Sequence, residues 1–160
     1  MEIHYTDGWF RAKKRPGELW SSERAHSSFK QRTLYAAVIG PLKHPTAFME
    51  FNRDWIGVNF LDRLLRVYLN YSFVEVEPGR MFLTMSTYRE FEGLSDNVKN
   101  GTTYIFKQDG LVLLREQDVT NKVLRTSKRM ADVSGNWDKY PNFGEYESLL
   151  RLERSTKPLE

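Results

Sequence analysis

The sequence has no cysteine, and none of its apolar stretches approaches the roughly 18 residues that would span a membrane. The absence of cysteine excludes disulfide bonds, thiol nucleophiles and cysteine-ligated metals. The first ten residues, MEIHYTDGWF, also lack the basic segment and apolar run of a secretory signal. We therefore expect a cytoplasmic protein that does not enter a membrane.

An excess of charge of one sign is also missing, because 24 lysines and arginines are offset by 21 acidic residues and the formal net charge is +3. So mild a charge identifies no partner. Aromatic residues, in contrast, make up 14% of the chain, a proportion that favours sheet surfaces over a helical bundle. The length suits one globular domain, which we place at residues 1–154, and we interpret residues 155–160 as a disordered tail or tag remnant.

Apolar and polar residues alternate through the middle of the chain, and this period of two predicts β-strands. The alternating stretches are residues 47–52, 55–62, 66–77 and 81–92. The Pro78–Gly79 turn separates the last two stretches. The Asp109–Gly110 pair, between apolar residues 102–107 and 111–118, predicts a further hairpin. Because the connections are short, we expect an antiparallel meander.

The flanks of this region have a less regular pattern. Residues 23–32, which follow two possible capping serines, predict one short helix, and residues 33–39 predict a strand. Residues 119–135 favour another strand, whereas the polar, turn-rich residues 93–101 predict an exposed loop. Together these elements predict a mostly β or α+β single domain with about eight strands and one or two short helices.

The known sequence signatures of catalysis are missing from the chain. It has neither a Gly-x-Ser-x-Gly elbow nor a phosphate-binding glycine loop. Its histidines, His4, His26 and His44, are far apart, and none has a second ligand at a metal-binding spacing. We therefore expect no enzymatic activity, no metal site and no cofactor.

Basic residues concentrate at residues 11–15, near aromatic rings, and at residues 122–129. Such clusters are solvated faces, patches for an acidic protein partner, or surfaces for single-stranded nucleic acid. A net charge of only +3 is weak for a nucleic-acid-binding protein. Nucleic acid is therefore an unlikely partner in our interpretation.

The segment NWDKYPNFGEYESLL, residues 136–150, contains four aromatic rings, and its proline opposes a continuous helix. We predict an extended turn at residues 135–144, followed by a short helix or strand. The rings either staple the chain end to the sheet or serve as exposed anchors for a partner. The partner-binding hypothesis comprises Trp137, Tyr140, Phe143 and Tyr146, together with the charged residues Asp96 and Lys99 of the predicted loop.

The β-rich body at residues 57–93, the TTYIFKQDGLV hairpin and the closing segment NWDKYPNFGEYESLL resemble the small cytoplasmic immunity proteins of bacterial polymorphic-toxin and contact-dependent-inhibition systems. The resemblance is one of style and segment order, and it spans Met1 to about Arg154. It implies that the protein neutralises one cognate toxin domain by direct contact, without turnover. Immunity proteins against nuclease toxins are typically acidic, so the slightly basic charge favours an acidic or non-nuclease toxin.

Two other classes of function stay open. A lipocalin-like β-barrel would enclose a small ligand, although the bulky residues of the predicted strands leave little room inside. A nucleic-acid-binding module is the third alternative.

Overall fold

The structure, a computed structural model, describes residues 1–154 and contains one large antiparallel sheet, a small two-stranded sheet and one α-helix. The predicted tail at residues 155–160 lies outside the described residues. The first strands are β1 (Ile3–Thr6), β2 (Trp9–Phe10), β3 (Arg15–Pro16), β4 (Leu19–Trp20) and β5 (Tyr35–Ile39). The later strands are β6 (Ala47–Asn52), β7 (Trp55–Leu61), β8 (Val67–Glu77), β9 (Arg80–Phe91), β10 (Val98–Phe106), β11 (Leu111–Asp118), β12 (Val123–Met130) and β13 (Trp137–Lys139).

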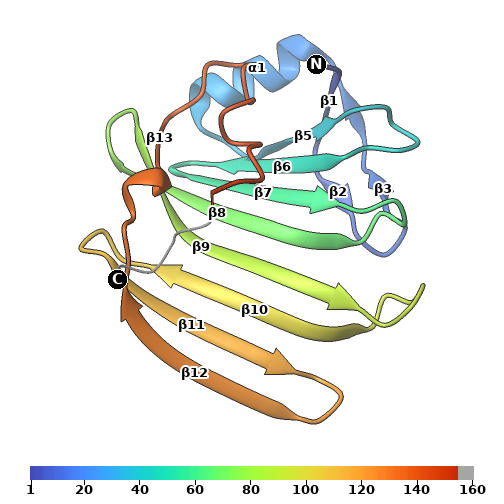
Figure 1. The fold of residues 1–160 in the computed structure, drawn as a ribbon. Helices are drawn as coiled ribbons and strands as arrows, with labels where there is room; N and C mark the ends of the chain where they lie inside the picture. The colour runs from blue at the N-terminus through green and yellow to red at the C-terminus, as the bar shows by residue number, and fades with distance from the viewer. Residues whose placement is uncertain (155–160) are drawn as a thin grey trace.

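The large sheet runs in the order β12-β11-β10-β9-β8-β7-β6-β5-β1-β4, with β13 paired to β9. Figure 1 shows the succession of strands from β5 to β12. The predicted mostly β, antiparallel meander is confirmed, although the sheet has eleven strands instead of about eight. Within the described residues the end strands β12 and β4 do not pair with each other, so this part of the chain forms an open sheet.

The two turns predicted at Pro78–Gly79 and Asp109–Gly110 are present in the structure. Gly79 and Gly110 have positive φ angles of 79° and 98°, which glycine adopts without steric strain. Gly110 ends the turn between β10 and β11, and its N–H donates to the Lys107 carbonyl at 3.1 Å. Both predicted hairpins are therefore confirmed.

The helix α1 (Ser22–Gln31) agrees with the helix predicted near residues 23–32. The Ser21 side chain caps it by accepting a hydrogen bond from the Arg24 backbone N–H at 3.2 Å. Arg32 ends it with a left-handed φ of 56°. The helix lies over the end of the sheet that contains β1 and β5 (Figure 1). Within the described residues, no helix is both long and apolar enough to span a bilayer.

The strands β1 to β4 were not predicted. Each has only two to four residues, which is too short for a period-two pattern. They form because β1 pairs with β5 and β4, while β2 and β3 pair with each other as a separate hairpin. Sequence-distant pairing therefore outweighs weak local propensity at this end of the chain.

The predicted loop at residues 93–101 is shorter in the structure, because β10 already begins at Val98. The register with β9 shifts between Val98 and Asn100, so Lys99 lies at a bulge in a strand and not in the loop. The Lys99 carbonyl also accepts the Val119 N–H at 3.0 Å. These polar residues join the sheet because β10 pairs with β9 on one side and with β11 on the other.

The closing segment differs from its prediction in its second half. Residues 134–136 form a short 3-10 helix, η1, and β13 then pairs with β9. Residues 145–152 contain turns and no helix or strand, contrary to the expected element. Side-chain contacts hold this segment in place, such as those of Tyr146 with Tyr35 and Phe51, and no repeating backbone pattern is needed.

The main core lies on the face of the sheet that is covered by α1 and the closing segment, which we call the inner face. The buried residues of this core include Tyr35, Met49, Phe51, Ile56, Val58 and Phe73. On the opposite, outer face a smaller buried cluster contains Trp9, Val38, Phe48 and Leu61. Trp9 belongs to β2 and stacks on Phe48 at 5.0 Å, so the β2–β3 hairpin folds over the outer face.

Candidate functional site

Two of the four rings in the partner-binding hypothesis, the buried Tyr146 and the half-buried Phe143, pack against other rings of the protein. Tyr146 has no exposed surface, contacts the Phe51 ring at 5.1 Å and shares a 3.3 Å hydrogen bond with the Tyr35 hydroxyl. Phe143 stacks on Tyr5 at 4.9 Å and on His26 at 4.6 Å. Tyr146 is therefore a core residue in this structure, and we remove it from the partner-binding candidates.

The other two rings are half-buried beneath arginines. The Tyr140 ring lies 3.6 Å from the Arg32 guanidinium carbon, and the Trp137 ring lies 4.2 Å from that of Arg80. Trp137 also packs on Phe82 at 4.8 Å. Both rings attach the closing segment to the body, which is the staple role, and each keeps an exposed part.

The charged residues of the hypothesis lie elsewhere on the molecule. Lys99 is exposed at the bulge of β10. Asp96 is exposed in the β9–β10 connection, and its carboxylate pairs with Lys14 Nζ at 2.7 Å. Lys14 belongs to the β2–β3 hairpin, so Asp96 faces the outer side of the sheet whereas the rings cover the inner face. The structure does not bring the two groups together.

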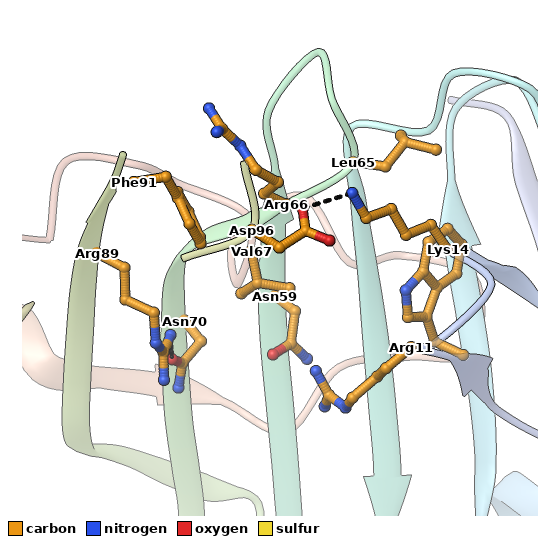
Figure 2. A pocket seen from close by; sticks show the side chains of 11 residues that line it. Arg11, Lys14, Asn59, Leu65, Arg66, Val67, Asn70, Arg89, Phe91 and Asp96 are labelled. Atoms are coloured by element: carbon orange, nitrogen blue, oxygen red, sulfur yellow. Dashed lines mark hydrogen bonds and ion pairs between the residues drawn. The ribbon is translucent and has the colours of Figure 1, made fainter. Parts of the chain in front are cut away.

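Asp96 instead lines a pocket on the outer face with a volume of about 520 Å³ (Figure 2). The floor is formed by the outward-pointing residues of β7, β8 and β9. The walls come from three separate arms, which are the β2–β3 hairpin, the β7–β8 connection and the β9–β10 connection. The lining residues are Trp9, Arg11, Lys14, Asn59, Leu65, Arg66, Val67, Asn70, Arg89, Phe91 and Asp96.

Arg66 fastens two of these arms to each other. Its Nη1 donates to the carbonyls of Gly93 and Ser95, both at 2.8 Å, and its guanidinium lies 4.6 Å from the Phe91 ring. Asp62 holds Arg66 in turn, through a 2.8 Å ion pair to Nε and a 3.0 Å hydrogen bond from the Arg66 N–H. These hydrogen bonds hold the pKa of Asp62 below its usual value although burial opposes the shift. The rim of the pocket is therefore fixed by charge-assisted contacts.

Four cationic side chains line the pocket, and three of them have a carboxylate partner. The pairs are Arg11 with Glu50 at 3.2 Å, Lys14 with Asp96 at 2.7 Å and Arg66 with Asp62 at 2.8 Å. Their charges are thus compensated within the protein.

Arg89 is the fourth cationic residue of the pocket, and it differs from the other three in its partner. In the part of the chain that the structure describes, its side chain has one hydrogen-bond partner, the neutral Asn70 Oδ1 at 2.8 Å. Arg89 is half-buried, and desolvation lowers its pKa from the ordinary value, with a further contribution from the like charge of Arg11. In Figure 2, Arg89 and Arg11 enter the pocket from opposite sides. An uncompensated guanidinium in a partly desolvated pocket attracts an anion.

A second cavity, of about 470 Å³, lies on the inner face between β8, β9, β10 and the end of the closing segment. Its lining is rich in tyrosine and comprises Tyr68, Leu69, Tyr71, Ser86, Tyr88, Thr102, Tyr104, Phe106, Leu152 and Arg154. Arg154 is buried, pairs with Asp138 and lies 5.1 Å from the Phe73 ring. We call this cavity the tyrosine groove.

Sequence reasoning found part of the outer pocket and missed its centre. Arg11 and Lys14 belong to the basic cluster singled out at residues 11–15, and Asp96 was in the partner-binding hypothesis. Arg89 and Asn70 were not singled out, because polar residues are expected on one face of an alternating strand. No local feature of the sequence distinguishes them from other polar strand residues.

Comparison of the chain with protein-family models, with curated proteins and with solved structures gave no significant match.

Proposed function

We propose that this protein is a non-enzymatic, cytoplasmic binding protein that neutralises a cognate toxin by direct contact, as the resemblance to bacterial immunity proteins implies. The observation that carries the proposal is the outer pocket, in which Arg89 has no carboxylate partner among the described residues. A protein partner that inserts an acidic side chain would supply that missing charge.

Two further features of the pocket support a protein partner. Its rim combines the half-buried Phe91 ring and aliphatic surface with charged groups, and this mixture is typical of binding interfaces. Arg66 and Lys14 tie the arms together, so the surface is preformed and little ordering is needed on binding. The basic charge of the pocket also agrees with the expectation of an acidic, non-nuclease toxin.

Co-expression with the product of the neighbouring gene in a bacterial host tests the proposal. We expect that product alone to arrest growth, and this protein to restore growth and to form a 1:1 complex by size-exclusion chromatography with light scattering. A catalytically silent, stoichiometric mechanism requires protection to depend on the ratio of the two proteins. Absence of both a complex and protection would refute the proposal.

The tyrosine groove supports a second candidate function, the binding of a small apolar ligand. Tyrosines on the inner faces of β8, β9 and β10 give an aromatic wall with hydroxyl groups at its surface, which suits a flat organic molecule. The environment-sensitive dye ANS provides a probe, and Tyr104→Ala should reduce its fluorescence if it binds there. An unchanged signal in that variant would remove the groove from consideration.

A further inference from the structure

We propose that the outer pocket is a carboxylate site, in which the guanidinium of Arg89 binds one carboxylate group with the help of Asn70 and Arg11. This inference rests on the proposed function and specifies its chemistry. The shared chemistry is a carboxylate, whether from an acidic side chain of a protein partner or from a free organic acid.

The charge of the pocket matches a single negative charge. Arg11, Lys14 and Arg66 are each neutralised by a carboxylate of this chain, so within residues 1–154 Arg89 is the one lining cation whose charge is uncompensated. A carboxylate carries one negative charge, whereas phosphate at neutral pH carries between one and two. The pocket therefore favours the carboxylate.

The arrangement of hydrogen-bond donors in the pocket also favours a carboxylate. A guanidinium presents parallel N–H groups that match the two oxygens of a carboxylate. Asn70 accepts from Arg89 through Oδ1, which fixes the guanidinium and leaves the Asn70 amide N–H groups to donate. On the neighbouring strand Asn59, the cross-strand partner of Asn70, donates to Glu50 at 3.2 Å and so helps to hold the carboxylate that pairs with Arg11.

The remaining lining suits the organic part of such a ligand. Trp9 is almost fully buried and forms a rigid wall through its stack on Phe48. Phe91, Leu65 and Val67 add apolar surface near the rim. Arg89 itself is half-buried, and a charge-assisted hydrogen bond is stronger in such partly desolvated surroundings.

The test is an NMR titration of the purified full-length protein, labelled with ¹⁵N, at low ionic strength. The probes are propionate, inorganic phosphate and the blocked residue acetyl-Glu-amide, so that each carboxylate probe carries one negative charge. We expect propionate or acetyl-Glu-amide to cause saturable shifts in the Asn70 side-chain amide and the Arg89 Nε–H signal. Tighter binding of acetyl-Glu-amide would identify a protein side chain as the source, and tighter binding of propionate would identify a free organic acid.

Three variants make the test specific. Arg89→Gln should weaken carboxylate binding by about tenfold or more, because it removes the charge and the paired donors. Arg89→Lys should lie between this variant and the wild type, since it keeps the charge but not the fork. The matched control is Arg129→Gln on β12, which should bind within about twofold of the wild type because Arg129 is exposed and lies three strands away from β9 in the sheet.

The inference is overturned if neither carboxylate probe gives saturable shifts, if Arg89→Gln and Arg129→Gln weaken binding equally, or if phosphate binds more tightly than both carboxylates. The titration needs no partner, so its failure is distinct from failure of the proposed function. A protein that binds propionate but does not protect cells would retain the carboxylate site and refute the immunity role. A protein that protects cells but binds no carboxylate would retain the immunity role and refute the carboxylate site.

Discussion

Tyr146 and Tyr35 attach the closing segment to the sheet at the scale of single residues. Their hydroxyls share a 3.3 Å hydrogen bond within the core, and the Tyr35 ring stacks on Phe51 at 4.5 Å. The sequence offered two roles for Tyr146, staple or anchor, and could not separate them. Burial decides in favour of the staple, because a ring without exposed surface contributes to folding and not to first contact with a partner.

Replacing Tyr146 by alanine should lower the free energy of unfolding by about 3–5 kcal/mol, as for other large aromatic residues removed from a core. The matched variant Tyr146→Phe keeps the ring and loses only the hydrogen bond to Tyr35, so its loss should be about 1 kcal/mol. Urea denaturation followed by tryptophan fluorescence measures both. Equal losses in the two variants would show that the ring itself does not stabilise the core.

The same tyrosines predict a loss of stability at alkaline pH. Burial, and then the proximity of Tyr146, raises the pKa of Tyr35 above its ordinary value of 10.0. The folded state therefore favours the neutral phenol, and its contribution to stability is complete below pH 10 or so and is lost progressively above it. We expect the urea midpoint to fall between pH 9 and pH 11.5, and Tyr35→Phe to reduce the slope. A midpoint that is constant over this range would contradict the prediction.

At the scale of elements, the meander from β6 to β12 could be predicted from period-two alternation and from its turns. The strands β1 to β4 could not, because their pairing depends on residues far away in the chain. The outer pocket escaped prediction for the same reason. Arg89 becomes part of a pocket only after the β2–β3 hairpin folds over the outer face, and no local pattern near Arg89 reports that contact.

The β10–β11 turn gives an element-scale prediction. Gly110 has a φ of 98°, and a Cβ atom there would lie 2.9 Å from the Ala131 carbonyl oxygen. Gly110→Ala should therefore destabilise the protein by about 1–2 kcal/mol through backbone strain, with more from the contact. Gly135→Ala is the control, since a Cβ at Gly135 meets nothing within 4 Å. Thermal unfolding compares them, and equal melting temperatures would contradict this account of the turn.

At the scale of the whole molecule, the two faces of the sheet have different roles. The inner face holds the main core under α1 and the closing segment, and the rings of that segment serve chiefly to hold it in place. The outer face is covered only in part by the β2–β3 hairpin, which leaves the pocket around Arg89 accessible. In the proposed function stability and recognition are separated between the two faces, and a substitution in the pocket should impair binding without unfolding the protein.

The affinity of the Arg89→Glu variant for the neighbouring gene's product, measured by isothermal titration calorimetry, tests this account most directly. Reversing the charge should weaken binding by about 30-fold or more, which is the loss of a hot-spot residue, while the melting temperature stays near that of the wild type. Arg129→Glu, with the same charge change on the exposed strand β12, should bind within about threefold of the wild type. A folded Arg89→Glu variant that binds as tightly as the wild type would contradict the account.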